Sequence, residues 1–502
     1  MQIASRQLTA AGFLARLARL VRHISRTPQI QSAPSSSANK KTSKKTSEKT
    51  DYHFALAVSG GADSLSMMLL AAKAAQQKQT QKSGRQNFNC QFSVLTVDHR
   101  LRKQATQEAR YVADLAKQMA LPHHLLTWRG AKPQSDIQAA ARTMRYQLMS
   151  DWCLKHKADG LVLAHHLDDQ AETVLLRLMR GAGVDGLAAM QAVRYQNGVA
   201  LLRPFLDVPR AVLRKTIHAS PIEPIDDPSN QNRQFARVQM RQLMPALADI
   251  GITAARLAQT AQNMQTSRQA LDLATQAAAR ALIRIDEFGI LSLARAGFAD
   301  LHEEIALRLL RTLLRQPESY PPRAEKLHRV WQDMISKKTG RRTLNGYLLH
   351  LRRDHIMISR ELAAIEKEQG ACLQLALGKT LIWDARYKVT FHKQSAHKQA
   401  AHKQAGHKQA GHKQAGHKQS AHKQARQSLT IRALRADGLQ QLRDRKIALP
   451  KQLPSAALVS LVSLWRGQKI LAVPAILAHK GVEVAILPHF VYNIAAERQN
   501  KA

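Results

Sequence analysis

The sequence predicts an α/β protein in which a doubly wound parallel sheet is followed by a helical domain and a small α+β C-terminal domain. Two observations lead to this fold class. From Phe54 onward, short apolar runs alternate with segments of helical period. Most polar and charged motifs in this half directly follow an expected strand. Ligands bind at the carboxyl ends of strands in such sheets, so we expect the functional site in this half.

The sheet domain is expected to occupy residues 51–215. Its strands are predicted at residues 54–58, 92–97, 123–128 and 160–164, and its helices at 65–75, 105–119, 137–156 and 168–179. Ser135 or Asp136 is expected to cap the helix that follows, because a short polar side chain there can accept a bond from the first backbone N–H groups.

The rest of the chain divides where the pattern changes. Residues 216–367 are expected to form a central, mainly helical domain, and residues 368–502 a C-terminal domain. Helical period marks residues 245–282, 300–316 and 323–336, whereas residues 341–360 are β-like. Strand-like segments follow at residues 381–391, 429–434 and 469–473.

Residues 1–50 form an N-terminal extension and linker. Apolar residues recur at helical spacing in residues 1–27, with arginines between them, which predicts an amphipathic helix. A short helix leading into the sheet domain is the favoured interpretation, and an organellar transit peptide is the alternative. Residues 32–50 are a low-complexity linker.

Charge is the most unusual property of the composition. The formal net charge is +40, of which residues 1–50 carry +9 and the tract 392–426 carries +8. The remaining +23 predicts a polyanionic partner, with nucleic acid favoured over a membrane surface. The three cysteines form no CxxC pair, which argues against a zinc ribbon, an iron–sulfur cluster or a disulfide framework and favours a cytoplasmic protein. No apolar run is long enough to span a membrane.

A glycine turn ends the first expected strand and precedes a helix. This geometry points backbone N–H groups and a helix N-terminus at an anion, so the turn is a candidate phosphate site. It matches neither GxxxxGK[ST] nor GxGxxG, and a plain strand–turn–helix junction is the alternative. Its candidate ATP-binding residues are Ser59, Gly60, Gly61, Ala62, Asp63 and Ser64.

Two further motifs could contact a nucleotide. Asp98 and His99 directly follow the second strand, where an acid can hold a ribose hydroxyl or a metal-bound water and a histidine can carry a proton. Arg142 and Arg145 lie three residues apart and share a helix face suited to phosphate. A polar loop and solvated helix arginines are the respective alternatives.

The most specific motif follows the fourth strand. His165 and His166 leave the strand, and three acids, Asp168, Asp169 and Glu172, begin the next helix. Acids at a helix N-terminus are favoured by the helix dipole alone. Their position at the mouth of a phosphate site nevertheless suits Mg²⁺ on ATP or a cationic substrate, with Asp63 and Asp168 as candidate metal ligands.

A basic stripe follows a strong turn sequence at residues 227–230. Arg233, Arg237 and Arg241 fall four residues apart, so they would form one positive face of a helix. Phosphate or an RNA backbone is the natural counterpart, and a capped loop-to-helix transition is the alternative.

Six stretches together resemble the tRNA(Ile)-lysidine synthetases, a family of the PP-loop ATP pyrophosphatase superfamily. They are SGGADS (59–64), VDHRLR (97–102), AARTMRY (140–146), LAHHLDDQAETVLLRLMRGAGVDGL (163–187), RPFLDVPR (203–210) and DDPSNQNRQFARVQMR (226–241). The family's usual forms are VDHGLR and a serine after RG, so Arg100 and Ala182 are departures. The C-terminal likeness, at residues 383–387 and 465–467, is weaker.

The resemblance implies an adenine nucleotide alpha hydrolase-like fold and an ATP-dependent ligase. The expected reaction joins L-lysine to C2 of the wobble cytidine 34 of tRNA(Ile) with a CAU anticodon, through an adenylated cytidine. The products are lysidine, AMP and pyrophosphate, and codon reading changes from AUG to AUA. ATP and Mg²⁺ are the implied cofactors, the domains after residue 215 are expected to contact tRNA, and a homodimer is left open.

The resemblance also assigns roles to residues. The glycine turn would clamp ATP, with Asp63 near the metal or pyrophosphate. Asp168, Asp169 and Glu172 would meet Mg²⁺ or lysine, and Arg142, Arg145 and His165 would contact phosphate or the activated base.

Two alternatives remain, one from the same superfamily and one from another class. A 2-thiolating PP-loop tRNA enzyme would generally rely on paired cysteines, which this chain lacks. A catalytically silent RNA-binding protein would not need the intact acids and glycines.

A tandem repeat interrupts the C-terminal domain at residues 392–428. His-Lys-Gln followed by two mostly small residues occurs seven times, with a five-residue period that suits neither helix nor strand. Metal chelation and an RNA-attracting arm are alternatives. The favoured interpretation is a solvated insertion in a loop between two strands, because loop-closure cost grows slowly with length.

Overall fold

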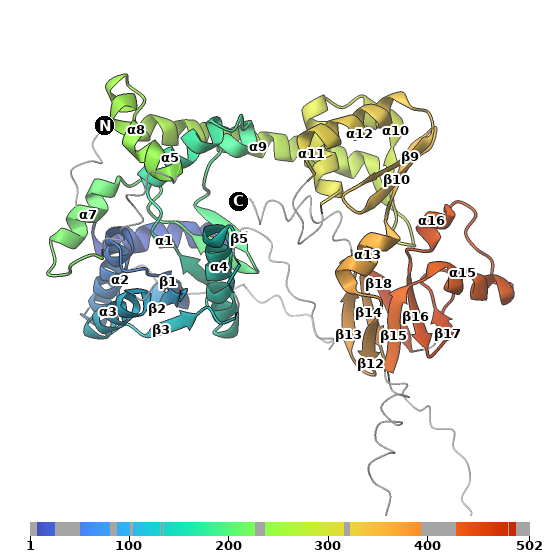
Figure 1. Cartoon of the computed structure of the whole chain (residues 1–502), viewed down its shortest axis with the longest axis horizontal. Helices are drawn as coiled ribbons and strands as arrows, with labels where there is room; N and C mark the ends of the chain where they lie inside the picture. The colour runs from blue at the N-terminus through green and yellow to red at the C-terminus, as the bar shows by residue number, and fades with distance from the viewer. Residues whose placement is uncertain are drawn as a thin grey trace, which may run out of the picture. The chain divides into compact units, whose positions relative to one another are not determined.

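The computed structural model forms two compact units, one of residues Met1–Ala270 with Glu497–Ala502 and the other of Leu271–Ala496 (Figure 1). Each unit is considered by itself. No helix in the part of the chain that the structure describes has the length and apolar character needed to cross a bilayer. The described residues are 8–25, 51–80, 88–100, 104–130, 132–133, 135–225, 236–315, 322–392, 428–479 and 481–487.

The first unit is built on a six-stranded sheet of order β3-β2-β1-β4-β6-β5. Every neighbouring pair is parallel except β5 with β6. The doubly wound parallel sheet is therefore confirmed. Its strands are β1 (Asp51–Ala57), β2 (Asn89–Asp98), β3 (His123–Thr127), β4 (Gly160–Val162), β5 (Val193–Gln196) and β6 (Val199–Leu202).

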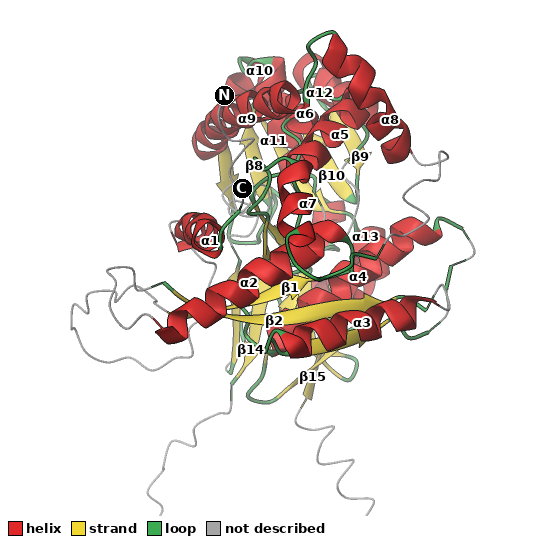
Figure 2. Ribbon diagram, turned by 90° about the vertical axis from the view of Figure 1, so that its left-hand side faces the viewer, coloured by secondary structure: helices red, strands yellow, loops and turns green. Residues whose placement is uncertain are grey.

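Alternate residues of β1 face opposite layers of helices. Phe54 and Leu56 join one buried cluster, and Ala55 joins another on the opposite face. Helices α1 (Ala10–Ser25), α2 (Ala62–Thr80), α3 (Gln104–Gln118) and α7 (Arg210–His218) contribute to the first cluster, and α4 (Ile137–Lys155) to the second. Figure 2 shows α2 and α3 lying over β1 and β2 on the same face. Burial on both faces explains the nearly continuous apolar strands.

The expected elements of this sheet match the observed ones closely, but one hairpin was not anticipated. Strands β5 and β6 pair around Asn197 and Gly198, which have φ values of 49° and 75°. Asn-Gly flanked by strand-forming residues is a strong hairpin signal, because both turn positions need positive φ. The sequence therefore held a local signal for this hairpin, which our sequence analysis did not use.

Further helices of the first unit form a small cluster of their own. They are α5 (Leu167–Leu178), α6 (Val184–Leu187), α8 (Ala236–Asp249) and α9 (Ala254–Leu282), whose end belongs to the second unit. Ala171 and Val174 of α5 are buried with Leu257 and Ala261 of α9. This packing holds α5, which carries the acidic motif, against the following helices.

The second unit begins with an antiparallel sheet of order β7-β8-β11-β10-β9. The predicted β character of residues 341–360 is confirmed as β9 (Gly340–Leu344), β10 (Tyr347–Leu351) and β11 (His355–Arg360), and β7 (Ile283–Ile285) and β8 (Leu291–Ala294) complete the sheet. Its helices are α10 (Arg295–Ala299), α11 (Glu303–Leu313) and α12 (Ala324–Ser336).

The C-terminal part of this unit has two small sheets, of order β12-β15-β16-β17 and β13-β14-β18. Their strands are β12 (Leu373–Ala376), β13 (Thr380–Trp383), β14 (Tyr387–Phe391), β15 (Ser428–Ala433), β16 (Val462–Arg466), β17 (Lys469–Ala472) and β18 (Val482–Ile486), and the helices are α13 (Leu362–Gln369), α15 (Arg435–Asp444) and α16 (Ser455–Leu458). The α+β class expected for the C-terminal domain is confirmed.

The prediction of one strand over residues 381–391 was wrong. The segment is a hairpin of β13 and β14, turned at Asp384 and Ala385 with φ values of 50° and 51°. No glycine marks this turn. Two arginine side chains bind the Asp384 carboxylate and hold the turn in place.

Two other predictions concern segments that the structure does not test fully. The strands that flank the repeat are β14 and β15, whereas residues 393–427 lie outside the described residues. The domain boundaries after residues 50, 215 and 367 stay a prediction.

Candidate active site

The glycine turn between β1 and α2 is held by its own side chains and by a distant loop. Gly60 has a φ of 87°, and a Cβ there would lie 2.6 Å from Ile225 Cδ1. The Ile225 N–H donates to the Gly60 carbonyl at 2.9 Å. Ser64 Oγ accepts from the Ser59 N–H at 3.2 Å and donates to the Gly61 carbonyl at 3.0 Å. These contacts fix a tight turn that only glycine fits at residue 60.

Asp63 lies in the first turn of α2. Its Oδ2 is 3.5 Å from His166 Nε2 and 3.7 Å from Arg210 Nε. Its Oδ1 is buried and has no hydrogen-bond partner among the described residues. Burial raises the pKa of Asp63, but His166, Arg210 and Arg214 together lower it below its ordinary value. The side chain is thus an ionised carboxylate with one oxygen available to a ligand.

His166 is the N-cap of α5 and the centre of the acidic motif. Its Nδ1 accepts from the Asp169 N–H at 3.3 Å, and its own N–H donates to Asp169 Oδ2 at 3.1 Å. Because Nδ1 accepts, Nε2 carries the proton and faces Asp63 and Asp169, each at 3.5 Å. Burial lowers the pKa of His166, but Asp63, Asp169 and Asp168 raise it overall. The histidine links α2 to α5 through its contacts with Asp63 and Asp169.

Asp168 connects the motif to α7. Its Oδ2 accepts from the Arg210 N–H at 2.8 Å and lies 3.7 Å from His166 Nδ1. Arg210 therefore contacts two acids, Asp168 through its backbone and Asp63 through its guanidinium. Both predicted metal ligands meet at the start of this one helix.

Glu172 is buried one turn further along α5. Its Oε1 binds Arg241 Nε and Nη2, each at 2.9 Å, and its Oε2 has no partner among the described residues. Burial raises the pKa of Glu172 in spite of Arg241. A buried, half-satisfied carboxylate has a strong tendency to take a further donor or cation.

Four arginines lie around His165. The imidazole pKa is well below its ordinary value, because the ring is buried and four arginines lie near it. The ring is therefore neutral at physiological pH, and its Nδ1 has no partner in the described part of the chain. The arginines, in order of effect, are Arg203, Arg142, Arg237 and Arg145.

The predicted helix pair Arg142 and Arg145 does share a face. Both guanidinium groups lie near the Tyr146 ring, at 5.4 Å and 5.9 Å from its centroid. Arg203 is buried, and burial lowers its pKa to about 10. A cluster of like charges without acids among its members suits a polyanion.

Asp98 and His99 have different surroundings. Asp98 is buried and accepts from the Arg100 N–H at 2.8 Å and from Thr106 Oγ1 at 3.1 Å, so both carboxylate oxygens hold the loop. His99 lies edge-on to the Trp128 ring, with centroids 6.3 Å apart. Burial lowers the pKa of His99, and nearby Arg145 adds to this effect.

The three arginines that were predicted to contact tRNA differ in their surroundings. Arg233 lies outside the described residues. Arg237 is exposed, whereas Arg241 turns inward to pair with Glu172. Only Arg237 is thus seen as a free positive group on this face of α8.

The described residues contain no group of three or more His, Cys, Asp or Glu side chains arranged to hold a metal ion alone. Mg²⁺ usually takes one or two carboxylates together with substrate phosphates. The unpartnered Asp63 Oδ1 beside the glycine turn fits that requirement, and so does the half-exposed Asp168.

Sequence reasoning missed two contributors, Arg210 and Arg203, and included His166 in the acidic motif without giving it a role of its own. A signal for Arg210 exists, because it begins a helix directly after Pro209. A cation at a helix N-terminus opposes the helix dipole, which indicates an acid nearby.

The fold and the glycine turn define a PP-loop protein, and residues 34–247 match the family model of the PP-loop domain. A relative from Ruegeria pomeroyi, named tRNA(Ile)-lysidine synthase, is 38% identical over 66% of this chain and 75% of its own length. Relatives of the same name from Methylobacterium nodulans and Rhodopseudomonas palustris are each 40% identical, over 61% and 60% of this chain and 89% of their own lengths. The chain belongs to the tRNA(Ile)-lysidine synthase family.

Proposed function

We propose that this protein forms lysidine in tRNA(Ile), using ATP to activate the wobble cytidine 34 of a CAU anticodon and L-lysine to modify it. The observation that carries the proposal is the meeting of three groups at the carboxyl ends of β1 and β4. These groups are the glycine turn, the acids of α2 and α5, and the arginines around His165.

The glycine turn and Asp63 form the ATP half of the site. Backbone N–H groups at the start of α2 suit the phosphates. Asp63, with its free Oδ1, would hold Mg²⁺ carried by ATP, and Asp168 would assist. When bound, the ion would neutralise phosphate charge. Arg210 contacts both carboxylates, Asp168 through its backbone N–H and Asp63 through its guanidinium, and would help to position them.

The arginines suit the nucleic-acid half of the site. The cytidine carbonyl oxygen attacks the α-phosphate of ATP, and pyrophosphate leaves. Arg142 and Arg145 can neutralise the negative charge of the α-phosphate as this bond forms. Neutral His165 can donate a hydrogen bond to the base or accept one from it.

Asp169 and Glu172 suit the side-chain ammonium group of lysine. Glu172 Oε2 is unpartnered, and Asp169 lies one turn before it on α5. The amine then attacks C2 of the adenylated cytidine and AMP leaves. A carboxylate with a raised pKa, such as Glu172, can take the proton that the ammonium must lose.

A strongly basic chain supports tRNA as the partner, with Arg237 beside the site and the region after residue 215 as further contacts. We expect the protein to work in the cytoplasm and leave monomer against homodimer to measurement. Thiolation is disfavoured, because Cys90 and Cys153 are buried and only Cys372 is exposed.

The test is an incubation of the full chain with ATP, labelled lysine and a CAU-anticodon tRNA(Ile) transcript. We expect pyrophosphate release that needs tRNA, and a lysine adduct at the wobble nucleoside by mass spectrometry. Omitting lysine should leave adenylated tRNA. Equal pyrophosphate release without tRNA, or a wobble sulfur in place of lysine, would refute the proposal.

A further inference from the structure

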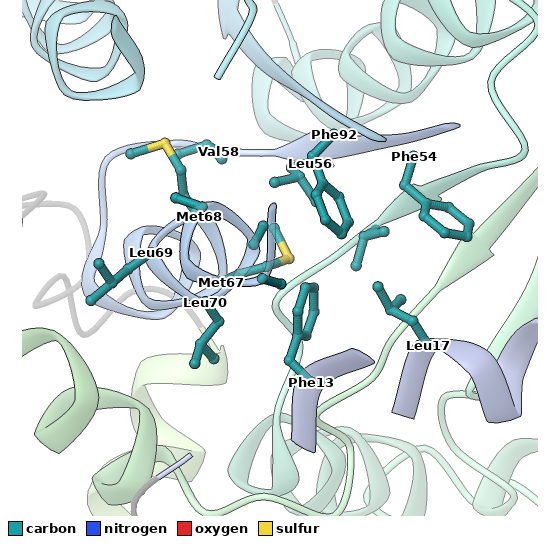
Figure 3. Packing of buried hydrophobic residues seen from close by; sticks show 14 of the residues in the cluster. Phe13, Leu17, Phe54, Leu56, Val58, Met67, Met68, Leu69, Leu70 and Phe92 are labelled. Atoms are coloured by element: carbon teal, nitrogen blue, oxygen red, sulfur yellow. The ribbon is translucent and has the colours of Figure 1, made fainter. Parts of the chain in front are cut away.

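Helix α1 lies outside the segment that matches the PP-loop domain, since that match begins at residue 34. Its side chains are nevertheless part of the core of the first unit. Phe13 and Leu17 are completely buried, and Leu20 and Val21 nearly so. Figure 3 shows Phe13 and Leu17 pointing from α1 toward Phe92 and the other core residues. A helix that only led into the domain would not need this burial.

One face of α1 holds the loop of residues 203–209. The Phe13 ring stacks on the Phe205 ring, with centroids 5.7 Å apart. Arg16 Nη1 donates to the Pro204 carbonyl at 3.2 Å and also to the Asp207 carboxylate. The same helix thus supplies an apolar contact and a charged contact to this one loop.

The opposite side of that loop meets the active site. Phe205 forms a parallel β-bridge with His166, and the Leu167 N–H donates to the Val208 carbonyl at 2.9 Å. The loop ends at Pro209, and Arg210 begins α7 with its contacts to Asp63 and Asp168. A displacement of the loop would therefore move both the N-cap of α5 and Arg210.

We propose that α1 stabilises the active site by holding the loop of residues 203–209 in place. In this proposal Arg16 is a positioning residue, which acts on the ATP-binding carboxylates Asp63 and Asp168 through that loop and Arg210. This inference rests on the proposed function for its activity readout. It assigns to helix α1 of the N-terminal extension a role in positioning the active site. Arg16 itself touches none of the reacting groups.

The test compares single variants of the full chain. Arg16→Ala should raise the KM for ATP about tenfold, because small misplacements of binding groups are costly. Arg16→Lys, which can still donate to Asp207 or Pro204, should recover most of that loss. Arg19→Ala is the matched control, because Arg19 is exposed on the same helix. Binding of tRNA should be the same in all variants.

A double-mutant cycle with Arg210→Ala separates positioning from general destabilisation. If Arg16 acts through Arg210, Arg16→Ala should change the affinity for ATP much less on the Arg210→Ala background than on the wild type. An undiminished effect on that background would overturn the proposal. So would an Arg16→Ala protein that binds ATP as the Arg19→Ala protein does.

Calorimetric titration of ATP into the free protein gives the cycle a readout that needs no lysidine formation. If the wild type binds ATP but makes no lysidine, the proposed function fails while the positioning role of Arg16 can still be judged. Thermal unfolding of each variant shows whether an ATP defect merely follows lost stability. A defect that tracks the unfolding temperature across all variants would also refute the positioning role.

Discussion

Each unit of the molecule contains a cluster of buried charge, and the two clusters differ in how completely they are paired. In the second unit, Asp384 accepts from Arg360 Nε at 3.1 Å and Arg386 Nε at 2.6 Å. Arg360 also binds Glu368 at 2.6 Å. In the first unit, Asp63 and Glu172 each keep a buried oxygen without a partner among the described residues.

The difference separates charge used for structure from charge held ready for a ligand. Burying a carboxylate oxygen without a hydrogen-bond donor costs free energy of folding. We therefore expect such an atom where a bound ligand supplies the missing donor or cation. The second cluster has internal partners and fastens β11 to the β13–β14 turn. The first keeps Asp63 Oδ1 and Glu172 Oε2 without a partner among the described residues, so both oxygens can accept from a ligand. The predictions below test this comparison.

The largest effect is expected at Asp63. Replacing it with asparagine keeps the shape of the side chain but removes the negative charge that we propose holds the metal ion on ATP, so the rate of tRNA-dependent pyrophosphate release should fall about a thousandfold. Binding of tRNA should persist, because the arginines are untouched. Kinetic assays and a tRNA filter-binding assay measure the two quantities. An active Asp63→Asn enzyme would remove Asp63 from the site.

Asp384→Asn should lower the stability of the second unit and leave ATP binding unchanged. It leaves Arg360 and Arg386 buried beside a neutral amide, which should cost about 3–5 kcal/mol of unfolding free energy. Urea unfolding followed by tryptophan fluorescence measures this loss, because Trp383 and Trp465 are both buried in the second unit. ATP affinity of the folded fraction should be unchanged. A large loss of ATP affinity without loss of stability would erase the distinction between the clusters.

A core variant tests how firmly α1 belongs to the first unit. Phe13→Ala should cost about 3–5 kcal/mol, because it leaves a cavity beside Phe92 and Phe205. Thermal unfolding measures this loss. A removable transit peptide would give a variant as stable as the parent.

His350 in β10 supplies a pH-dependent test. It is buried, its Nε2 has no partner among the described residues, and burial together with Arg341 and Arg352 lowers its pKa. Below about pH 6.5, His350 binds a proton in the unfolded chain but stays neutral in the folded protein, where its pKa is lower. The free energy of unfolding therefore falls with falling pH. His350→Leu should lessen that fall between pH 7.5 and 5.5 by about 1 kcal/mol. Equal pH slopes in both proteins would contradict this.

The sequence predicts much of the first unit because its signals are local. Apolar runs between turn residues mark the parallel strands, and polar residues after them mark the site. Glu172 and Arg241, by contrast, are 69 residues apart, and no local pattern indicates that their side chains meet. The hairpin at Asp384 was missed for the same reason, since its stabilising partner Arg360 lies 24 residues earlier.

The smallest effect is expected at Arg100, the departure from VDHGLR. Its φ is 52°, a left-handed conformation that costs a side-chain-bearing residue about 1–2 kcal/mol relative to the ordinary helical region. Glycine adopts it freely but loses more entropy on folding, so Arg100→Gly should stabilise the protein by no more than about 1 kcal/mol. Asp98 would keep its bond, because the donor is the backbone N–H of residue 100.

Ala385→Gly is the matched control for Arg100→Gly, because Ala385 has a φ of 51° in the second unit. Both variants should raise the unfolding temperature by a similar small amount, since both relieve the same backbone conformation. Of the two variants, we expect only Arg100→Gly to alter nucleotide affinity as well, because Arg100 follows His99, which the sequence predicts to contact the nucleotide. A gain in stability at Ala385 but a loss at Arg100 would mean that the arginine side chain makes a favourable contact that outweighs the backbone cost.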